Sequence, residues 1–112
     1  YEATPEACRR VLAEARRADI VVKASGVGVF DDELMHGVLD SAAPQAVTVY
    51  WDVDAAATLE ELAAATDHPL RRRLPEFDLV LTYGGGPPVV QKYTALGARR
   101  CVPIYNALDP ET

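Results

Sequence analysis

Four short apolar runs, rich in β-branched residues, recur along the chain and are separated by segments with helical periodicity. The second run, AVTVYW, is almost continuously apolar. Runs of this kind are typical of strands buried in a parallel sheet. We therefore predict four strands, near residues 19–24, 46–51, 78–82 and 100–104.

The segments around these runs carry helix signals. Thr4, Pro5 and Glu6 combine a capping residue, a proline suited to the first helical position and an acid in the first turn. The residues from Thr58 to Glu61 form a capping box ahead of an Ala-rich stretch. Helices are expected to open at Thr4, at Asp31 or Asp32, at Thr58, near residue 68 and after the glycine-rich turn at 84–86, where the last one would end at Gly97.

Strands that alternate with helices predict right-handed β-α-β crossovers and a parallel sheet. We expect an α/β fold of the Rossmann-like, three-layer αβα kind, with helices on both faces of the sheet. The 112 residues fit one domain, 1–112. Since the sequence begins without Met and stops at the start of a loop, we expect it to be a piece of a longer protein.

Composition narrows the class of partner. Apolar residues make up 49% and charged residues 25% of the chain, and the net charge is −6. An acidic chain of this kind is not expected to bind nucleic acid. No apolar stretch approaches a membrane span and no signal peptide is evident, so we expect a cytoplasmic protein. The two cysteines, Cys8 and Cys101, fit neither a disulfide framework nor a zinc site.

In parallel sheets, ligands bind at the carboxyl ends of the strands. Four segments should meet at that edge, namely SGVG, DVDAAAT, YGGGPP and YNALDPET. Each holds more Gly or acid than a plain connection needs. The candidate substrate-binding residues are Ser25, Gly26, Gly28, Tyr83, Gly84, Gly85, Gly86 and Asn106.

Asp52 and Asp54 directly follow the second strand and are the candidate catalytic residues. Their spacing matches neither a phosphoaspartate hydrolase nor a receiver domain. They could supply two ligands to a metal, although no further clustered ligand is visible. Alternation would place both carboxylates on one side, where mutual repulsion favours a general base. Loop acids that accept backbone N–H bonds are the common alternative.

The glycine-rich turn at 84–86 opens a helix and could attract an anion, but it lacks the P-loop lysine. A role in tight turns explains these glycines, and also Gly26 and Gly28, at least as well as contact with a ligand does. The run Arg71–Arg73 is more typical of a solvated helix face than of a phosphate site. His36 and His68 have no partner in sequence and are expected at the surface. Trp51 is expected in the core.

Several segments together resemble a known family. VVKASGVGVFDDEL, YWDVDAAATL and FDLVLTYGGGPPVVQKYTALGARRCVPIYNALDPET are similar to the N-terminal half of bacterial CgeB-like (spore-maturation-type) glycosyltransferases of GT-B architecture. The most specific part is YGGGPPVV followed by YNALDP. The similarity runs in order from about Asp19 to the end.

The resemblance implies a two-domain enzyme whose N-terminal domain shapes the acceptor side, while a second domain grips a nucleotide-sugar donor. It implies that Asp52 and Asp54 are acceptor-cleft acids and not metal ligands, and that no cofactor is needed. The fragment alone would be inactive. Donor, acceptor, stereochemistry and oligomeric state stay open. Two alternatives also stay open: a non-catalytic α/β module that binds a ligand or protein, and a metal-dependent Asp-x-Asp enzyme.

Overall fold

The computed structural model describes residues 4–26, 31–83 and 85–104. Its elements follow in the order α1 (Pro5–Ala15), β1 (Ile20–Ala24), α2 (Asp31–Ser41), β2 (Val47–Asp52), α3 (Ala55–Ala64), α4 (Pro69–Arg73), the 3-10 turn η1 (Leu74–Glu76), β3 (Leu79–Tyr83), α5 (Gly86–Ala95) and β4 (Cys101–Ile104). All four predicted strands are present within one or two residues of the expected bounds. The α/β class is confirmed.

The strands form one parallel sheet in the order β1-β2-β3-β4. Each strand therefore neighbours the next one along the chain, as expected for successive β-α-β crossovers. Within the described residues, no helix is long and apolar enough to cross a membrane.

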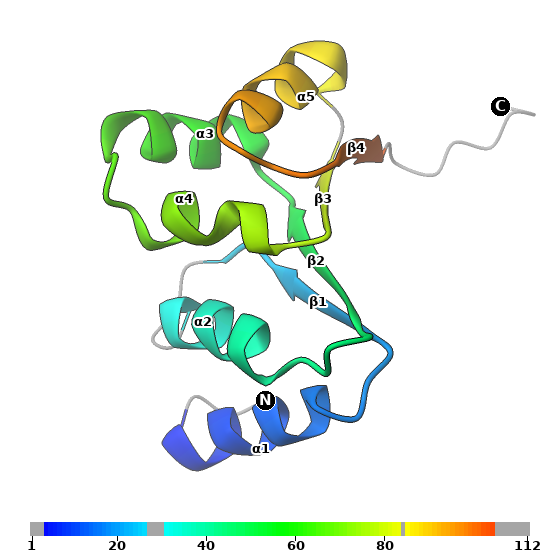
Figure 1. Ribbon diagram of the computed structural model, residues 1–112. Coiled ribbons are helices and arrows are strands. Elements are labelled where there is room, and N and C mark those ends of the chain that lie inside the picture. The colour runs from blue at the N-terminus through cyan, green and yellow to red at the C-terminus, as the bar shows by residue number, and fades with distance from the viewer. Residues whose placement is uncertain (1–3, 27–30, 84, 105–112) are drawn as a thin grey trace, which may run out of the picture.

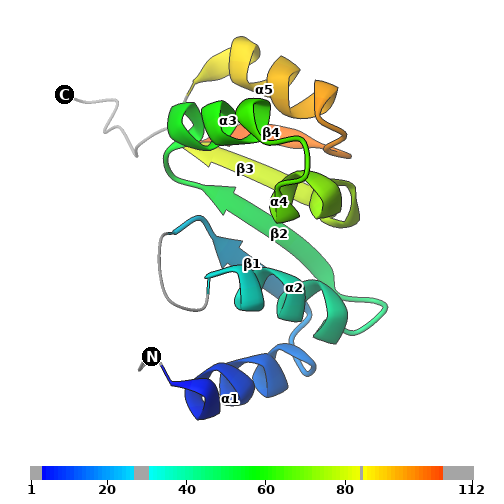
Figure 2. The ribbon, with the colours of Figure 1, turned by 90° about the vertical axis from the view of Figure 1, so that its left-hand side faces the viewer.

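The second helical layer that we expected is not formed by the described residues. Figure 1 shows the helices on one side of the sheet, and Figure 2 looks onto that side, with α2 in front of β1 and α4 in front of β2 and β3. The strand order explains this arrangement. When every crossover is right-handed and steps in the same direction, every connecting helix falls on the same face. Helices reach the other face only where the strand order reverses.

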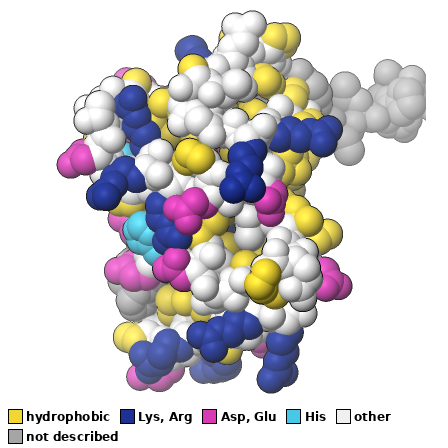
Figure 3. Space-filling model, in the orientation of Figure 1, with side chains coloured by type: hydrophobic (Ala, Val, Ile, Leu, Met, Phe, Trp, Pro, Cys, Tyr) yellow, Lys and Arg dark blue, Asp and Glu magenta, His cyan; other side chains and the backbone are white. Residues whose placement is uncertain are grey.

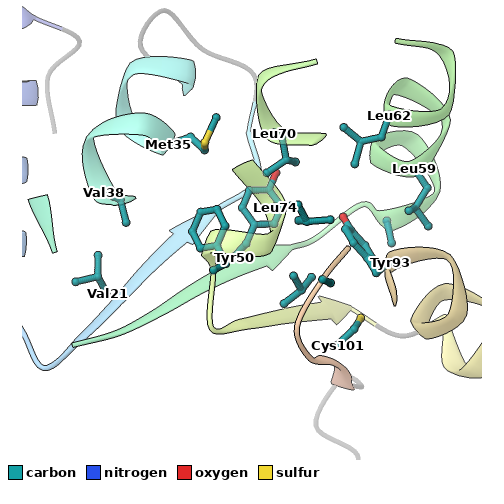
Figure 4. Packing of buried hydrophobic residues seen from close by; sticks show 14 of the residues in the cluster. Val21, Met35, Val38, Tyr50, Leu59, Leu62, Leu70, Leu74, Tyr93 and Cys101 are labelled. Atoms are coloured by element: carbon teal, nitrogen blue, oxygen red, sulfur yellow. The ribbon is translucent and has the colours of Figure 1, made fainter. Parts of the chain in front are cut away.

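The core fills the space between the sheet and this helical layer. Strand side chains that point toward the helices are buried, and Leu62, Leu74 and Phe77 are fully buried against them. Figure 4 shows Tyr50 and Tyr93 reaching into this cluster from the sheet and from α5. Helix α1 packs on α2, where a Cβ added to Gly37 would lie 2.4 Å from Leu12 Cδ1.

The opposite face of the sheet carries apolar side chains that no helix covers. Ile20, Val22 and Val47 are 62%, 48% and 42% exposed. Trp51 and Leu81 also lie on this face, as partners in the register of β2 and β3, and are half-buried. The expectation that Trp51 belongs to the core is therefore wrong. The half-buried Leu81 likewise shows that β3, which we expected in a sheet with helices on both faces, is covered on one face by the described helices.

Candidate functional site

A cleft of about 550 Å³ opens at the carboxyl ends of β1 and β2. Its lining residues come from the starts of the loops after these strands and from α2, α3 and the start of α4. Figure 2 shows how these helices are arranged in front of the sheet. This volume lies within the range of roughly 300–1,000 Å³ usual for small-molecule sites. The cleft therefore occupies the edge at which the sequence places ligand binding.

Three of the predicted residues line this cleft, namely Ser25, Gly26 and Asp54. The two loops that carry them are tied together. Ser25 N–H donates to the Trp51 carbonyl at 2.7 Å, and Ser25 Oγ accepts the Val53 N–H at 3.0 Å. Ser25 thus contributes to the shape of the cleft through the backbone of the neighbouring loop.

Asp54 caps helix α3 and remains exposed. Its Oδ1 accepts the Ala57 N–H at 3.5 Å, at the long limit of a hydrogen bond. The helix begins at Ala55, so the expected capping box at Thr58 is wrong. Asp54, a capping carboxylate ahead of three alanines, starts the helix four residues earlier than a cap at Thr58 would. Asp54 is the carboxylate in this turn that a ligand in the cleft can contact.

Asp52 lies below the cleft and is fully buried. Its Oδ1 accepts from the Asp54 N–H and the Thr58 hydroxyl, each at 3.0 Å, and its Oδ2 accepts from the Tyr93 hydroxyl. A carboxyl group enclosed by three donors has no contact with an acceptor. The prediction that Asp52 and Asp54 face the same cleft is therefore wrong for Asp52, whose contacts hold the turn that presents Asp54.

This burial also affects the groups next to Asp52. Burial raises the pKa of the Tyr93 hydroxyl, and its hydrogen bond to Asp52 raises it further. Burial likewise raises the pKa of the Cys101 thiol, with a smaller contribution from the charge of Asp52. Tyr93 and Cys101 are consequently held in their neutral forms, and the network is a set of donors around one carboxyl group.

On the opposite wall, Lys23 is buried against the first turn of α2. Its Nζ lies 2.6 Å from Asp31 Oδ1 and also donates to the Ala24 carbonyl. The side chain of Lys23 is 9% exposed and that of Asp31 is 31% exposed. The ammonium group of Lys23 is therefore already paired within the protein and is not free to hold an anion.

Sequence reasoning missed a histidine and a glutamate in the cleft. His68 caps α4, its Nδ1 accepting the Leu70 N–H at 3.2 Å, so that the neutral ring carries its proton on Nε2. Nε2 lies 3.7 Å from Glu61 Oε2. The position of His68 just before Pro69 was a capping signal. Nothing in the sequence pairs it with Glu61, because the two meet only once α3 and α4 have folded back on each other.

The other predicted site residues lie away from this cleft or outside the described residues. Tyr83 ends β3, and Gly85 and Gly86 form the turn that leads into α5; none of the three is among the lining residues. Gly85 has φ +88°, and a Cβ there would lie 2.4 Å from Val89 Cγ2, which is the reason for glycine at this turn. Gly28, Gly84 and Asn106 fall outside the described residues.

His36 and the arginine run have structural roles. Arg73 contacts Asp40 at 2.6 Å, Glu76 at 2.9 Å and His36 Nδ1 at 3.0 Å, which joins α2 to α4 and η1. Figure 3 shows acidic, basic and histidine side chains meeting in the middle of this face. Arg73 is therefore not a solvated residue as expected, and its charge is used within the fold.

The two aspartates do not form a pair of metal ligands in this arrangement, because both oxygens of Asp52 accept hydrogen bonds from the protein. Within the described ranges, no three His, Cys, Asp or Glu side chains come together closely enough to hold a metal ion.

Comparison with protein-family models found no match, and comparisons with curated proteins and with solved structures found none either. The resemblance to CgeB-like glycosyltransferases therefore stays a prediction.

Proposed function

We propose that this chain is the acceptor-side domain of a nucleotide-sugar-dependent glycosyltransferase of GT-B type, and that its cleft receives the acceptor. The observation that carries the proposal is the cleft at the carboxyl ends of β1 and β2, with the exposed carboxylate of Asp54 on its wall. The sequence resemblance supports the same reading from a separate direction.

Asp54 is the residue to which we assign the chemistry. In an inverting transfer, the acceptor oxygen forms a bond to the anomeric carbon of the donor, whose bond to the diphosphate oxygen breaks. The proton of the acceptor hydroxyl goes to Asp54, and the nucleoside diphosphate leaves. Asp52 acts as a positioning residue, since it holds the Asp54 N–H and the Thr58 hydroxyl. The glycine-rich turn ahead of α5 would lie toward the donor phosphates, which a second domain would hold.

The substitution Asp54→Asn tests this assignment. Asn caps a helix about as well as Asp, so the fold should be kept. In the protein encoded by the full reading frame, we expect kcat to fall by about 10²–10⁴-fold, because the base is lost. Donor affinity should be unchanged. The measurement is release of nucleoside diphosphate from a panel of nucleotide-sugars, and the 112-residue chain alone should give no turnover.

Wild-type rates in Asp54→Asn would make Asp54 a capping residue only. A chelator should leave the activity intact, and loss of turnover on chelation with recovery on adding Mn²⁺ would favour the metal-dependent alternative.

A second candidate, a non-catalytic module that binds a protein, is favoured by the uncovered apolar face of the sheet at Ile20, Val22 and Val47. Absence of nucleotide release by the protein of the full reading frame, across all donors and acceptors tried, would favour this reading over the enzyme.

A further inference from the structure

Tyr50 lines the cleft, and its hydroxyl group makes no hydrogen bond to another residue that the structure describes. The residue is 5% exposed and stands on β2, with its ring 5.6 Å from that of Phe77. Figure 4 shows its hydroxyl end directed toward Leu70, another lining residue. Burial raises the pKa of this hydroxyl, and the charge of Asp52 raises it further, so it is a neutral donor.

The Tyr50 hydroxyl is open to the cleft and not sealed in the core, because among the described residues it is Trp51 Nε1 that is a buried side-chain polar atom without a partner. A hydroxyl group placed in this way makes its hydrogen bond to what occupies the cleft, water or a ligand. The floor of the cleft therefore offers one directed hydrogen bond to whatever enters it.

The walls around this floor are acidic. Asp32 and Glu33 line one side from the first turn of α2, and Asp54 and Glu61 line the other from α3. Among the described residues, none of these four carboxylates pairs with Lys or Arg. Lys23 is already paired with Asp31. The contact of Glu61 in the described part of the chain is with the imidazole of His68, whose Nε2 lies 3.7 Å from Glu61 Oε2. Carboxylates on both walls create a negative potential that attracts a cation and repels a phosphate.

The four carboxylates are spread along the two walls. No three acidic, His or Cys side chains in the described part of the chain converge on one point. A positive charge on an extended organic molecule fits this distribution better than a single metal ion, because it can meet carboxylates from one or both walls while its polar groups reach the floor.

We propose that the cleft binds an organic ligand that carries both an ammonium group and a hydroxyl group. The ammonium group meets the carboxylates of the walls, and a hydroxyl group accepts from Tyr50. This inference rests on the proposed function, and within it the acceptor is an amino sugar or an amino alcohol.

Glucosamine and glucose are the matched probes, since they differ at one position by an ammonium in place of a hydroxyl. Titration of the 112-residue chain, followed by NMR shifts of the cleft residues, gives both affinities. We expect glucosamine to bind about tenfold more tightly at low salt, since exposed ion pairs contribute about two- to fivefold each. The preference should shrink as salt screens the charges.

Variants locate the effect. Glu61→Gln and Asp54→Asn should each reduce the preference for glucosamine by about threefold. Tyr50→Phe should weaken both sugars to a similar degree, since it removes a neutral contact. Glu14→Gln, which removes an exposed carboxylate on α1, is the control and should change nothing. Equal affinities for the two sugars, a preference that survives in both cleft variants, or no binding of either sugar would overturn the proposal.

These outcomes separate the inference from the proposed function, because the titration needs no transfer. If glucosamine binds but the protein of the full reading frame releases no nucleotide, the proposed glycosyltransferase function is contradicted and the proposed amine-binding site is supported. If the enzyme transfers sugar to neutral acceptors and shows no preference for amines, the glycosyltransferase function is supported and the amine-binding site is contradicted.

Discussion

At the scale of single residues, the two aspartates after β2 divide into different roles although they stand two positions apart. Their spacing predicted a shared direction, but Asp52 completes the strand and points under the helices while Asp54 starts one. What decides this is Tyr93, which lies 41 residues later in the sequence and supplies a donor from α5. Sequence spacing cannot show such a partner. The glycine at 85 was, by contrast, readable from local turn chemistry, whereas the same kind of signal placed the start of α3 at Thr58 and not at Asp54.

The network around Asp52 gives a stability prediction. Tyr93→Phe removes one donor and leaves a buried carboxyl oxygen without a partner, which should cost about 1–3 kcal/mol in the free energy of unfolding. Thr58→Ala should cost less, because Asp52 Oδ1 keeps the Asp54 N–H. Urea denaturation measures both. If Tyr93→Phe unfolds at the wild-type midpoint, the hydrogen bond to Asp52 does not stabilise the fold.

At the scale of elements, local signals placed the strands and the ends of helices well. Gly97, with φ +106°, stops α5 as its sequence position predicted. Contacts between elements were less accessible. The run Arg71–Arg73 gave no indication of which arginine would meet α2, because that depends on how α4 and η1 pack against Asp40 and His36. The pairing of Glu61 with His68 was hidden for the same reason.

Arg73 makes stability depend on pH. Its hydrogen bonds lower the pKa of both Asp40 and Glu76 in the folded protein. A lowered folded pKa contributes stability above the unfolded value, about 4, and this contribution is lost as the pH falls through the folded pKa. Both carboxylates are more than half exposed, so each pair should contribute less than about 1 kcal/mol.

The double variant Asp40→Asn with Glu76→Gln should therefore lose less stability than the wild type when the pH is lowered from about 7 to about 3. Urea midpoints at the two pH values give the comparison. The double variant Glu14→Gln with Glu60→Gln, which removes two exposed carboxylates that pair with no Lys or Arg among the described residues, serves as the control. An identical pH dependence in the wild type and the Asp40/Glu76 variant would show that these ion pairs do not contribute.

At the scale of the whole molecule, the sequence predicted a parallel α/β sheet but not that one of its faces would be left uncovered by the described residues. Apolar alternation is the same whether a face is covered or open, since Val22 and Val21 are equally apolar. Only the order of the strands decides which face receives the helices. The position of the cleft was predictable, because the carboxyl ends of parallel strands meet at one edge of the sheet. Its acidic walls were not, because they depend on how α2 and α3 are oriented.

The asymmetry of the sheet leads to the last prediction. Leu74 is fully buried between the sheet and the helices, whereas Leu81 is half-buried on the uncovered face. Leu74→Ala removes buried methyl groups and leaves a cavity, which should cost about 2–5 kcal/mol. Leu81→Ala loses less contact and opens no enclosed cavity, so about 1 kcal/mol is expected. Urea unfolding of the two variants under the same conditions compares identical chemistry on the two faces. Equal losses in the free energy of unfolding would mean that the face carrying Leu81 is covered in solution. If a second copy of the chain covers it, the loss in Leu81→Ala should grow with protein concentration.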